Sequence, residues 1–393
     1  MINVNLFGVG AAGNKAAITV LEKNYLDASH VKLVNTTTKD IPDKYKQGTD
    51  LVVQFSSMLG GCGKEPSKGA KAITDAILNN KIDLASMITE DCKEVILVAS
   101  TEGGTGCGAT PVIAKFFETM NIPVHVFALI GFQDESRGLN NTLKFFKNLS
   151  DNVILHTIMN DQFLDYTGDY TKAEEAANDE FARQVNIIIG SKMIPSSQNI
   201  DDTDLYKATA TAGYMDIKSI SLSGVKNQDT FNEAIIKAFE NGNCLEYDKS
   251  AKRLAIIVNA SERTRASIDS RLEVIKRYVG EPFEVFRHLQ DNPDDQEEYI
   301  DIIASGMNFP EKGIIDIGKK YASLKQNLNK AGKSMGDIFS GISFDEDEDE
   351  FDMDLRQKND NATAMFAKAI GASSGKINNV VQTKPANSKD EEY

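Results

Sequence analysis

The sequence predicts an α/β protein in which a doubly wound sheet is followed by a smaller α+β unit. Up to about residue 170, continuous apolar runs of strand length alternate with helical patterns, as in a parallel sheet covered by helices on both faces. Several of these runs end in glycine-rich turns, at the carboxyl edge where such sheets bind ligands. From Tyr214 onward, strand-like and helical segments follow one another in a mixed order.

The length and charge of the chain limit its classes of function. Its 393 residues suffice for two domains and a tail, and a hydrophobic content of 41% indicates a globular body. The formal net charge is −15, and part of it lies in the acidic run Asp345–Asp354. Because contacts to nucleic-acid phosphates need Lys and Arg, we expect no direct binding of DNA by the body.

The cysteines and the lack of long apolar runs predict a cytoplasmic protein. Cys62, Cys92, Cys107 and Cys244 show neither metal-ligand nor disulfide-framework spacing, so we assign no metal ligands and expect a reducing compartment. No apolar run approaches the length of a membrane span, and the sequence begins directly with a strand-like segment rather than a signal peptide.

A first glycine-rich turn follows the strand predicted over Ile2–Gly8. Gly8-Val9-Gly10-Ala11-Ala12-Gly13-Asn14 has the spacing GxGxxG, which alone is a weak indication of nucleotide binding. A nicotinamide-dependent dehydrogenase also needs an acidic residue at the end of the second strand, for the ribose hydroxyls. The second strand, Val31–Val34, ends instead in Asn35-Thr36-Thr37-Thr38. A Rossmann-type enzyme that uses NAD therefore remains only the alternative from another functional class.

The most informative stretch is a second glycine turn, at residues 99–111. It follows the apolar run Glu94–Ala99 and precedes a helical pattern from Pro111 to about Met120. Four glycines among residues 103–108 remove Cβ atoms from the turn, so that backbone N–H groups can close on an anion. Thr105 adds a hydroxyl donor, and the positive end of the following helix points to the same place. A tight strand-to-helix turn is the simpler interpretation of any single glycine turn.

Three further loops are predicted at the same edge of the sheet. A second glycine-rich loop there favours a nucleoside triphosphate, because it brings more backbone donors to the phosphates. The loops follow strands that end near residues 55, 130 and 158, and their candidate residues are Gly60, Gly61, Gly63, Glu135 and Asn160.

Residues 103–109, Gly-Gly-Thr-Gly-Cys-Gly-Ala, resemble the signature loop of the tubulin/FtsZ superfamily, which holds the phosphates of GTP. The resemblance covers about residues 2–308. It implies a Rossmann-like GTPase that binds GTP and GDP with Mg²⁺ and assembles with copies of itself into head-to-tail filaments. The family usually begins this run with another glycine, where this chain has Glu102. An acid beside phosphates is unfavourable, so we expect Glu102 to turn outward or to lie near a metal ion or the neighbouring subunit.

The resemblance also assigns contacts to the nucleotide. Asn178, on the helix predicted over Lys172–Ile189, falls at the base-contacting position, where an amide can pair with the guanine edge. The aromatic residue that often stacks on the base one turn earlier is replaced by Glu174. The residues implied to bind the nucleotide are Gly8, Gly10, Ala11, Ala12, Gly13, Asn14, Asn35, Gly60, Gly61, Gly63, Gly103, Gly104, Thr105, Gly106, Cys107, Gly108, Glu135, Asn160 and Asn178.

A second motif, Asn199-Ile200-Asp201-Asp202-Thr203-Asp204, follows that helix. Asp201 and Asp202 suit a helix start, so solvated capping acids are the simplest interpretation. The pattern Asn-x-Asp-x-x-Asp also resembles the catalytic synergy loop of the family, and two carboxylates three residues apart lie on one helix face. The resemblance implies that Asn199, Asp201 and Asp204 act on the GTP of the adjacent subunit. There they could polarise a water for attack on the terminal phosphate.

The resemblance divides the chain into six regions. They are a GTP-binding Rossmann-like domain (1–170), a central helix (171–191), the synergy loop with its following helix (192–213), an α+β domain (214–308), a C-terminal helix (309–340) and an acidic tail (341–393). A helix after the second domain is more typical of phage and plasmid tubulins than of bacterial division FtsZ, which remains the alternative. We therefore expect a filament that positions or segregates phage or plasmid DNA. The tail is expected to contact a DNA-bound adaptor or a phage capsid or nucleus component.

Overall fold

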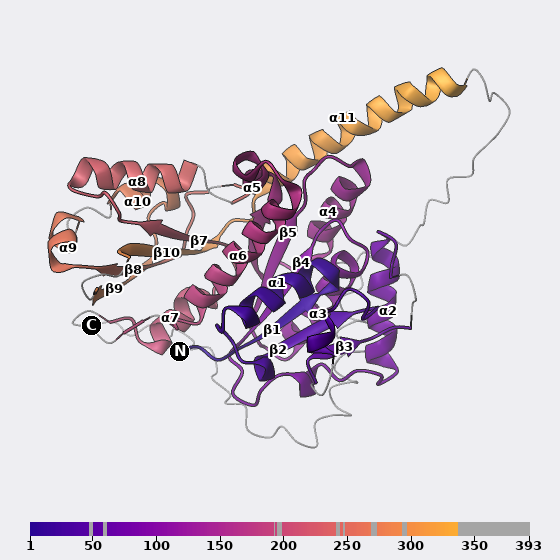
Figure 1. Ribbon diagram of the computed structural model, residues 1–393, viewed down its shortest axis with the longest axis horizontal. Coiled ribbons are helices and arrows are strands. Elements are labelled where there is room, and N and C mark those ends of the chain that lie inside the picture. The colour runs from indigo at the N-terminus through magenta and orange to yellow at the C-terminus, as the bar shows by residue number, and fades with distance from the viewer. Residues whose placement is uncertain are drawn as a thin grey trace, which may run out of the picture.

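The computed structural model describes residues 1–46, 50–57, 61–191, 193–194, 199–240, 244–246, 248–268, 273–292 and 297–336. Within these residues the strands form a ten-stranded sheet in the order β3-β2-β1-β4-β5-β6-β7-β10-β8-β9 (Figure 1). The strands are β1 (Val4–Val9), β2 (Val31–Asn35), β3 (Val52–Gln54), β4 (Glu94–Ser100), β5 (Val124–Ile130), β6 (Ile154–Met159), β7 (Gly213–Ser221), β8 (Arg253–Ala260), β9 (Glu284–Asp291) and β10 (Tyr299–Met307).

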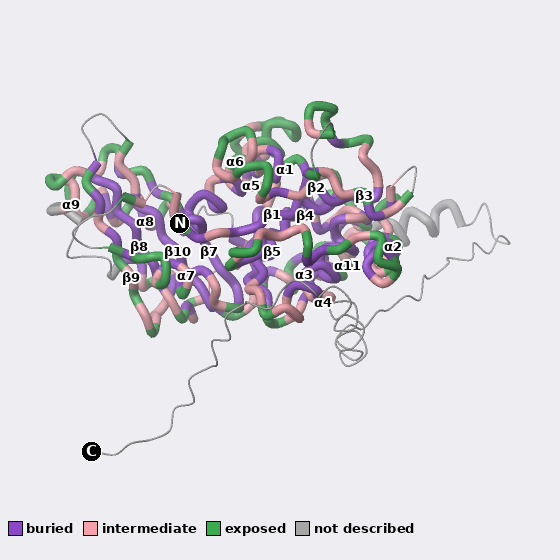
Figure 2. Tube along the Cα trace, turned by 90° about the horizontal axis from the view of Figure 1, so that it is seen from below, coloured by how far each residue is buried: buried purple, intermediate pink, exposed green. Residues whose placement is uncertain are grey.

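The first six strands are parallel, which confirms the doubly wound α/β fold predicted from their apolar runs. Every residue of β1 and β5 is buried, and Figure 2 shows buried residues along the middle strands of the sheet. From β1 the chain proceeds to β2 and β3 on one side, while β4, β5 and β6 follow on the other. The winding direction therefore reverses between β1 and β4, and the carboxyl ends of these two strands form the crevice where such folds bind ligands.

Helices cover both faces of the sheet. Apolar residues of α1, α5, α6 and α7 pack on one face, and those of α2, α3, α4, α8, α10 and α11 pack on the other. The helices are α1 (Gly10–Glu22), α2 (Pro66–Leu78), α3 (Thr105–Thr119), α4 (Ser136–Asn148), α5 (Asn160–Thr167), α6 (Tyr170–Ile188), α7 (Asp202–Thr209), α8 (Gln228–Glu240), α9 (Glu262–Ile268), α10 (Glu273–Val279) and α11 (Glu311–Gly336). No helix of the described ranges is long and apolar enough to cross a membrane.

The central helix α6 connects the two ends of the parallel strands. Asp169 caps its first turn by accepting the backbone N–H of Lys172 at 2.9 Å. Its 19 residues span about 28 Å. At its far end the backbone N–H of Ile2, just before β1, donates to the oxygen of Ile189 at 3.0 Å. In Figure 1, α6 runs from α5 at one end to α7 at the other.

The second half of the sheet is antiparallel except at its edge. β10 pairs antiparallel with both β7 and β8, and β9 adds a parallel edge strand beside β8. The join to the first half is short, because β6 and β7 pair only through Ile154 with Gly213 and Leu155 with Tyr214. The α+β character predicted after Tyr214 is present, and the six predicted region boundaries stay predictions.

One local expectation needs correction. The helix predicted to begin at Pro111 begins at Thr105, because glycines at its start let α2 pass close beside it. A Cβ on Gly108, for example, would lie only 1.9 Å from the oxygen of Pro66. Residues 262–279 are described as α9 and α10, with residues 269–272 outside the described ranges. The short helix α5 was not expected. The acidic tail also lies outside the described residues.

Candidate functional site

The glycine turns that follow β1 and β4 meet at the crevice. Gly10 adopts a φ of +76°, and a Cβ built on it would lie 2.9 Å from the backbone nitrogen of Gly106. A Cβ on Gly106 would in turn lie 2.9 Å from the oxygen of Val9. Gly13 lets α1 approach β4 so closely that its Cβ would be 2.1 Å from the oxygen of Val98. The two turns are therefore in backbone contact. The other residues predicted in the first turn lie at the end of β1 and the start of α1: Gly8, Ala11 and Ala12.

Thr105 joins the loops that follow β2, β3 and β4. Its hydroxyl lies 3.1 Å from the hydroxyl of Thr36 and donates to the sulfur of Cys62 at 3.4 Å. A Cβ on Gly104 would be 2.6 Å from the Cβ of Cys62, whereas a Cβ on Gly103 would meet no atom within 4 Å. The three loops thus converge on the N-terminus of α3, and the signature turn is open at Gly103. A helix N-terminus flanked by glycine backbone is a favourable site for an anion.

The remaining glycines and Cys107 determine the backbone conformation of the loops after β3 and β4. Gly61 and Gly63 have φ values of +71° and +56°, in the left-handed region that favours glycine. The backbone N–H of Gly108 donates to the oxygen of Gly104 at 3.1 Å, inside the first turn of α3. Cys107 is buried, its thiol donates to the oxygen of Asn141 at 3.3 Å, and burial raises the pKa of that thiol. The predicted Gly60 lies outside the described residues.

Buried amides beside these turns lack protein partners. Asn14 is 1% exposed, and neither its side-chain oxygen nor its nitrogen has a partner within the described part of the chain. The same holds for Nδ2 of Asn35, at the end of β2, and for Oδ1 of Asn160, directly after β6. A buried amide without a partner costs about 1–3 kcal/mol per group. Their position at the carboxyl ends of the strands fits a polar ligand that supplies the missing hydrogen bonds.

Ion pairs link the loops at the mouth of the crevice. Lys64 pairs with Glu135, and Arg137 lies 3.9 Å from Glu65. Asn141 donates from its amide to the backbone oxygen of Lys64 at 3.0 Å. The loop after β3 is therefore tied to the loop after β5, and Glu135, predicted to bind the nucleotide, already has a cationic partner.

The side chain of Glu102 packs against the loop after β5 and the start of α4, so the expectation that it points outward is wrong. Its carboxylate fills a notch at Gly131 and Gly138: a Cβ on Gly131 would lie 2.1 Å from its Oε2, and one on Gly138 would lie 3.0 Å from its Cδ. The backbone N–H of Gln133 hydrogen-bonds to this carboxylate, while burial raises its pKa. The acid is thus kept away from the open side of the signature turn by glycines that the next loop provides.

An aromatic pair that the sequence analysis missed lies at the start of α6, the helix that carries Asn178. Asn178 is half-buried on α6, and Glu174 pairs with Lys15 at 3.5 Å, so position 174 supplies no stacking ring. Tyr170 is the first residue of α6 and is 55% exposed. Its ring packs edge-on against the ring of Phe132, with the ring centroids 4.6 Å apart. Phe132 lies three residues before Glu135 in the same loop. This proximity is the one feature of the sequence from which the pair could have been predicted.

The acids of the Asn-x-Asp-x-x-Asp motif lie in the first turn of α7. Asp201 is the N-cap, and its Oδ1 accepts the backbone N–H of Asp204 at 2.8 Å. The capping interpretation is therefore correct for Asp201, although it occupies only one of the two carboxylate oxygens. Asp204 lies 3.4 Å from Lys207, and the side chain of Asp204 keeps 34% of its surface exposed. Asp201 and Asn199 are exposed as well, so a second molecule could reach all three residues.

The acids and the glycine turns lie at opposite ends of the same strands. Thr209, the last residue of α7, donates to the carboxylate of Glu94 at 2.7 Å, and Glu94 is the first residue of β4. The signature turn follows the last residue of β4. Seven residues of extended strand span about 23 Å. Asp201 and Asp204 therefore cannot act on a ligand held by the glycine turns of their own chain.

Comparison with known proteins finds similarity to one family. Residues 3–168 match the family model described as Tubulin/FtsZ family, GTPase domain. The cell division protein FtsZ of Aquifex aeolicus is 24% identical over 334 residues, which cover 82% of this chain and 87% of that protein. Tubulin-like protein CetZ2 of Haloferax volcanii is 25% identical over 291 residues, or 70% of this chain and 75% of that protein.

Solved structures share the fold at lower sequence identity. TubZ of Clostridium botulinum phage c-st has a TM-score of 0.63 at 17% identity and covers 83% of this chain and 100% of that chain. A GTPγS-form protofilament of TubZ from Bacillus thuringiensis serovar israelensis has a TM-score of 0.69 at 14% identity, covering 86% and 94%. At these identities the likeness establishes the arrangement of the elements, and the sites must be argued from the residues.

Proposed function

We propose that this chain, which carries a GTPase domain of the tubulin/FtsZ family of polymerising GTPases, assembles head to tail so that each subunit completes the hydrolytic site of its neighbour. The observation that supports this proposal is the separation of the two candidate sites by the length of β4. Head-to-tail stacking would bring the α7 end of one subunit against the glycine turns of the next. The family match also sets aside the NAD-dependent alternative, and β2 ends in Asn35 without the acid that such an enzyme needs.

GTP would occupy the crevice between β1 and β4. The open turn at Gly103, with Gly104, Thr105 and Gly106, would hold phosphates through backbone N–H groups and the α3 N-terminus. Cys107 and Gly108 would support that turn by packing against α4 and α2. Further contacts to the phosphates and the nucleoside are proposed for Gly8, Gly10, Ala11, Ala12, Gly13, Asn14, Asn35, Gly60, Gly61, Gly63, Glu135, Asn160 and Asn178.

Hydrolysis would use groups from two subunits. Asp204 of one subunit, with the free oxygen of Asp201 and the amide of Asn199, would orient a water for attack on the terminal phosphate of GTP bound by the other. Mg²⁺ would supply neutralisation of the phosphate charge. The loops that would face this water are stiffened by the ion pair of Lys64 with Glu135, which is exposed at the same mouth.

Relatives support assembly. The solved structures that share this fold include CetZ2 of Haloferax volcanii as a GTPγS-bound protofilament and a helical two-stranded filament of TubZ from Bacillus thuringiensis. For this chain we propose a homopolymer that positions or segregates phage or plasmid DNA through an adaptor or a phage component bound by residues 341–393. Cell division in the manner of FtsZ is the second candidate, since FtsZ proteins are among the sequence relatives.

The proposal is tested by Asp204→Ala. Binding of GTP by the monomer should be unchanged, because the glycine turns lie at the other end of β4. Hydrolysis in filaments should fall about 10²-fold or more, as expected for loss of a group that orients the reacting water. Asp202→Asn is the matched control, since Asp202 shares the same helical turn but occupies a variable position of the motif, and its variant should hydrolyse GTP normally.

Mixing two variants tests the geometry. Gly103→Val should fold, because a Cβ at Gly103 meets no atom, yet it should obstruct the phosphate turn. Asp204→Ala and Gly103→Val proteins should each be inactive, and their mixed filaments should regain turnover at interfaces that combine an intact turn with intact acids. Normal hydrolysis by Asp204→Ala alone, or no recovery in verified mixed filaments, would exclude the shared site.

A further inference from the structure

The loop that carries the acidic motif is held at both ends by the edge strand β9. Ile194, before the loop, donates its backbone N–H to Oε1 of Gln290 at 3.0 Å. Ile200, directly before Asp201, donates its backbone N–H to Nδ1 of His288 at 3.3 Å. His288 and Gln290 are buried on β9, with 1% and 3% of their surface exposed, while Arg287 and Asp291 on either side of them are exposed. Two neighbouring buried positions of one strand therefore hold the start and the end of this segment.

The hydrogen bonds also fix the state of the imidazole. Nε2 of His288 lies 3.1 Å from Oε1 of Gln290, an oxygen that can only accept. Nε2 therefore carries the proton, which leaves Nδ1 as the acceptor that the Ile200 N–H requires. Gln290 is oriented in turn, because its Nε2 donates to Oδ1 of Asn259 on β8 at 3.1 Å. A chain of side-chain bonds from β8 through β9 thus ends on the residue next to Asp201.

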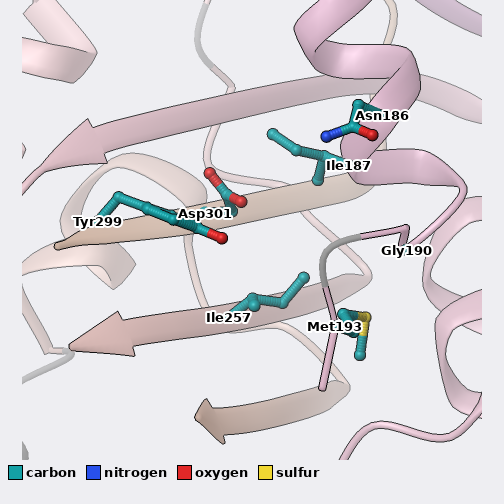
Figure 3. A pocket seen from close by; sticks show the side chains of 7 residues that line it. All are labelled: Asn186, Ile187, Gly190, Met193, Ile257, Tyr299 and Asp301. Carbon is teal, nitrogen blue, oxygen red and sulfur yellow. The ribbon is translucent and has the colours of Figure 1, made fainter. Parts of the chain in front are cut away.

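Apolar packing differs between the two ends of this segment, because Ile200 is a buried member of the core whereas Met193 is only partly buried against it. A small pocket lies beside Met193, between the end of α6 and strands β8 and β10 (Figure 3). Its lining residues are Asn186, Ile187, Gly190, Met193, Ile257, Tyr299 and Asp301. Where a side chain faces a void, it has fewer neighbours to fix its position. At the less buried end, the bond from Ile194 to Gln290 therefore adds to the positioning of the chain.

We propose that His288 and Gln290 are positioning residues for hydrolysis, which hold the acidic loop in the geometry needed at the subunit interface. This inference rests on the proposed role of Asp201 and Asp204 in the neighbouring subunit's site. His288 touches no reacting atom. It acts through the backbone of Ile200, which sets the entry of the chain into the N-cap of α7.

The test compares two substitutions of similar size at one position. His288→Asn keeps an oxygen near the place of Nδ1 and can still accept the Ile200 N–H, whereas His288→Gln places its oxygen near Nε2 and cannot. Turnover per filament interface should fall about 10- to 100-fold in His288→Gln, the loss expected from a displacement of about 1 Å at a catalytic group. It should stay within about threefold of the parent protein in His288→Asn. Arg287→Gln, which changes an exposed neighbour on β9, serves as the control.

GTP affinity of the monomer, the midpoint of thermal unfolding and the amount of sedimented filament are measured for every variant. The proposal expects these three quantities to be alike in the Asn and Gln proteins while turnover differs. Equal turnover in the two proteins, whether both normal or both low, would overturn it. The Asp204→Ala protein, measured in parallel, separates the proposed interfacial site from the proposed role of His288. If Asp204→Ala is inactive while His288→Gln is normal, the interfacial site is supported and the positioning role of His288 is refuted. If Asp204→Ala is active, the interfacial site itself fails.

Discussion

The two ends of the parallel sheet bury different sets of polar side chains: unpartnered amides lie beside the glycine turns, whereas a connected chain of hydrogen bonds joins the amino ends of β4 and β5 to β6 and α7. At the carboxyl ends, the amide of Asn14 and parts of Asn35 and Asn160 lack partners in the described structure. At the amino ends, His125 on β5 bonds to Glu94 on β4 through Nε2 at 3.0 Å and to His156 on β6 through Nδ1 at 3.0 Å. The second oxygen of Glu94 accepts the hydroxyl of Thr209, so this chain of bonds reaches α7.

This difference distinguishes side chains that can bind a ligand from side chains that hold the elements of the fold together. An unpartnered buried amide is a net cost unless a ligand completes it, so its persistence at the crevice points to a ligand. In the chain at the amino ends, Glu94, His125 and Thr209 bond to one another across three elements, while Nδ1 of His156 and Nδ2 of the nearby Asn5 have no partner within the described residues. The consequence of this chain is mechanical, since it fixes the helix that carries Asp204 to the strand that leads to the signature turn. The following predictions test this division, beginning with the largest expected effect.

Glu94→Leu should destabilise the protein by about 3–5 kcal/mol, because it leaves a buried histidine and a buried hydroxyl without their shared partner. Both Glu94 and His125 are fully buried, so water cannot replace the lost bonds. The free energy of unfolding is measured by chemical denaturation. Glu90→Leu, at an exposed position just before β4, is the control and should change stability by less than about 0.5 kcal/mol. A loss below 1 kcal/mol for Glu94→Leu would show that the chain of bonds is not a supporting element.

Asn14→Leu and Thr209→Val should act in opposite ways. Leucine is close to asparagine in shape and removes two unsatisfied polar atoms, so Asn14→Leu should leave the unfolding free energy of the GTP-free protein unchanged or raised. Its affinity for GTP should fall by about 1–3 kcal/mol, which corresponds to roughly 5- to 150-fold in Kd. Thr209→Val should lose about 1–3 kcal/mol of stability and keep its GTP affinity. Isothermal titration and denaturation measure both quantities, and an unchanged affinity in Asn14→Leu would remove the amide from the nucleotide site.

Much of the crevice could be predicted because its signals are local. The strand end predicted near residue 130 is the end of β5, whose continuous apolar run is buried throughout. The glycine turns were likewise recognisable, because a position where two backbone segments approach closely requires glycine, and that glycine is visible in the sequence. The start of α3 was misplaced, since helix formation by Gly106 and Gly108 depends on their contact with other elements.

The supporting features could not be predicted because their partners are distant in sequence. Glu94, His125 and His156 are single polar residues in apolar strands, and only the strand order and register bring them together. The position of Glu102 depends on Gly131 and Gly138, and the residues around these two glycines do not indicate that a carboxylate packs against them. The pairing across the sheet, rather than the motif, decides these contacts.

The smallest expected effect is a dependence of stability on pH that arises from His156. Burial, with the nearby His125, lowers the pKa of His156 well below its ordinary value near 6.5. The unfolded chain therefore binds a proton more readily than the folded chain, so the stabilising contribution is present above about pH 6.5 and is lost as the pH falls toward the lowered value. One such proton changes the unfolding free energy by at most about 1.4 kcal/mol per pH unit. His288, whose pKa burial also lowers, adds to the slope with the same sign.

His156→Phe isolates this contribution. The imidazole stacks on Phe127 with ring centroids 3.9 Å apart and an interplanar angle of 8°, so a phenyl ring can keep that contact. The variant loses one partner of His125 and should be less stable at pH 7.5, but its unfolding free energy should fall less steeply between pH 7 and pH 5.5 than that of the parent. Denaturation series at these pH values measure both slopes. Asn14→Leu changes a group that does not titrate and should keep the parent slope; if His156→Phe keeps it too, the dependence on pH comes from elsewhere and the amino end of the sheet does not respond to protons through this histidine.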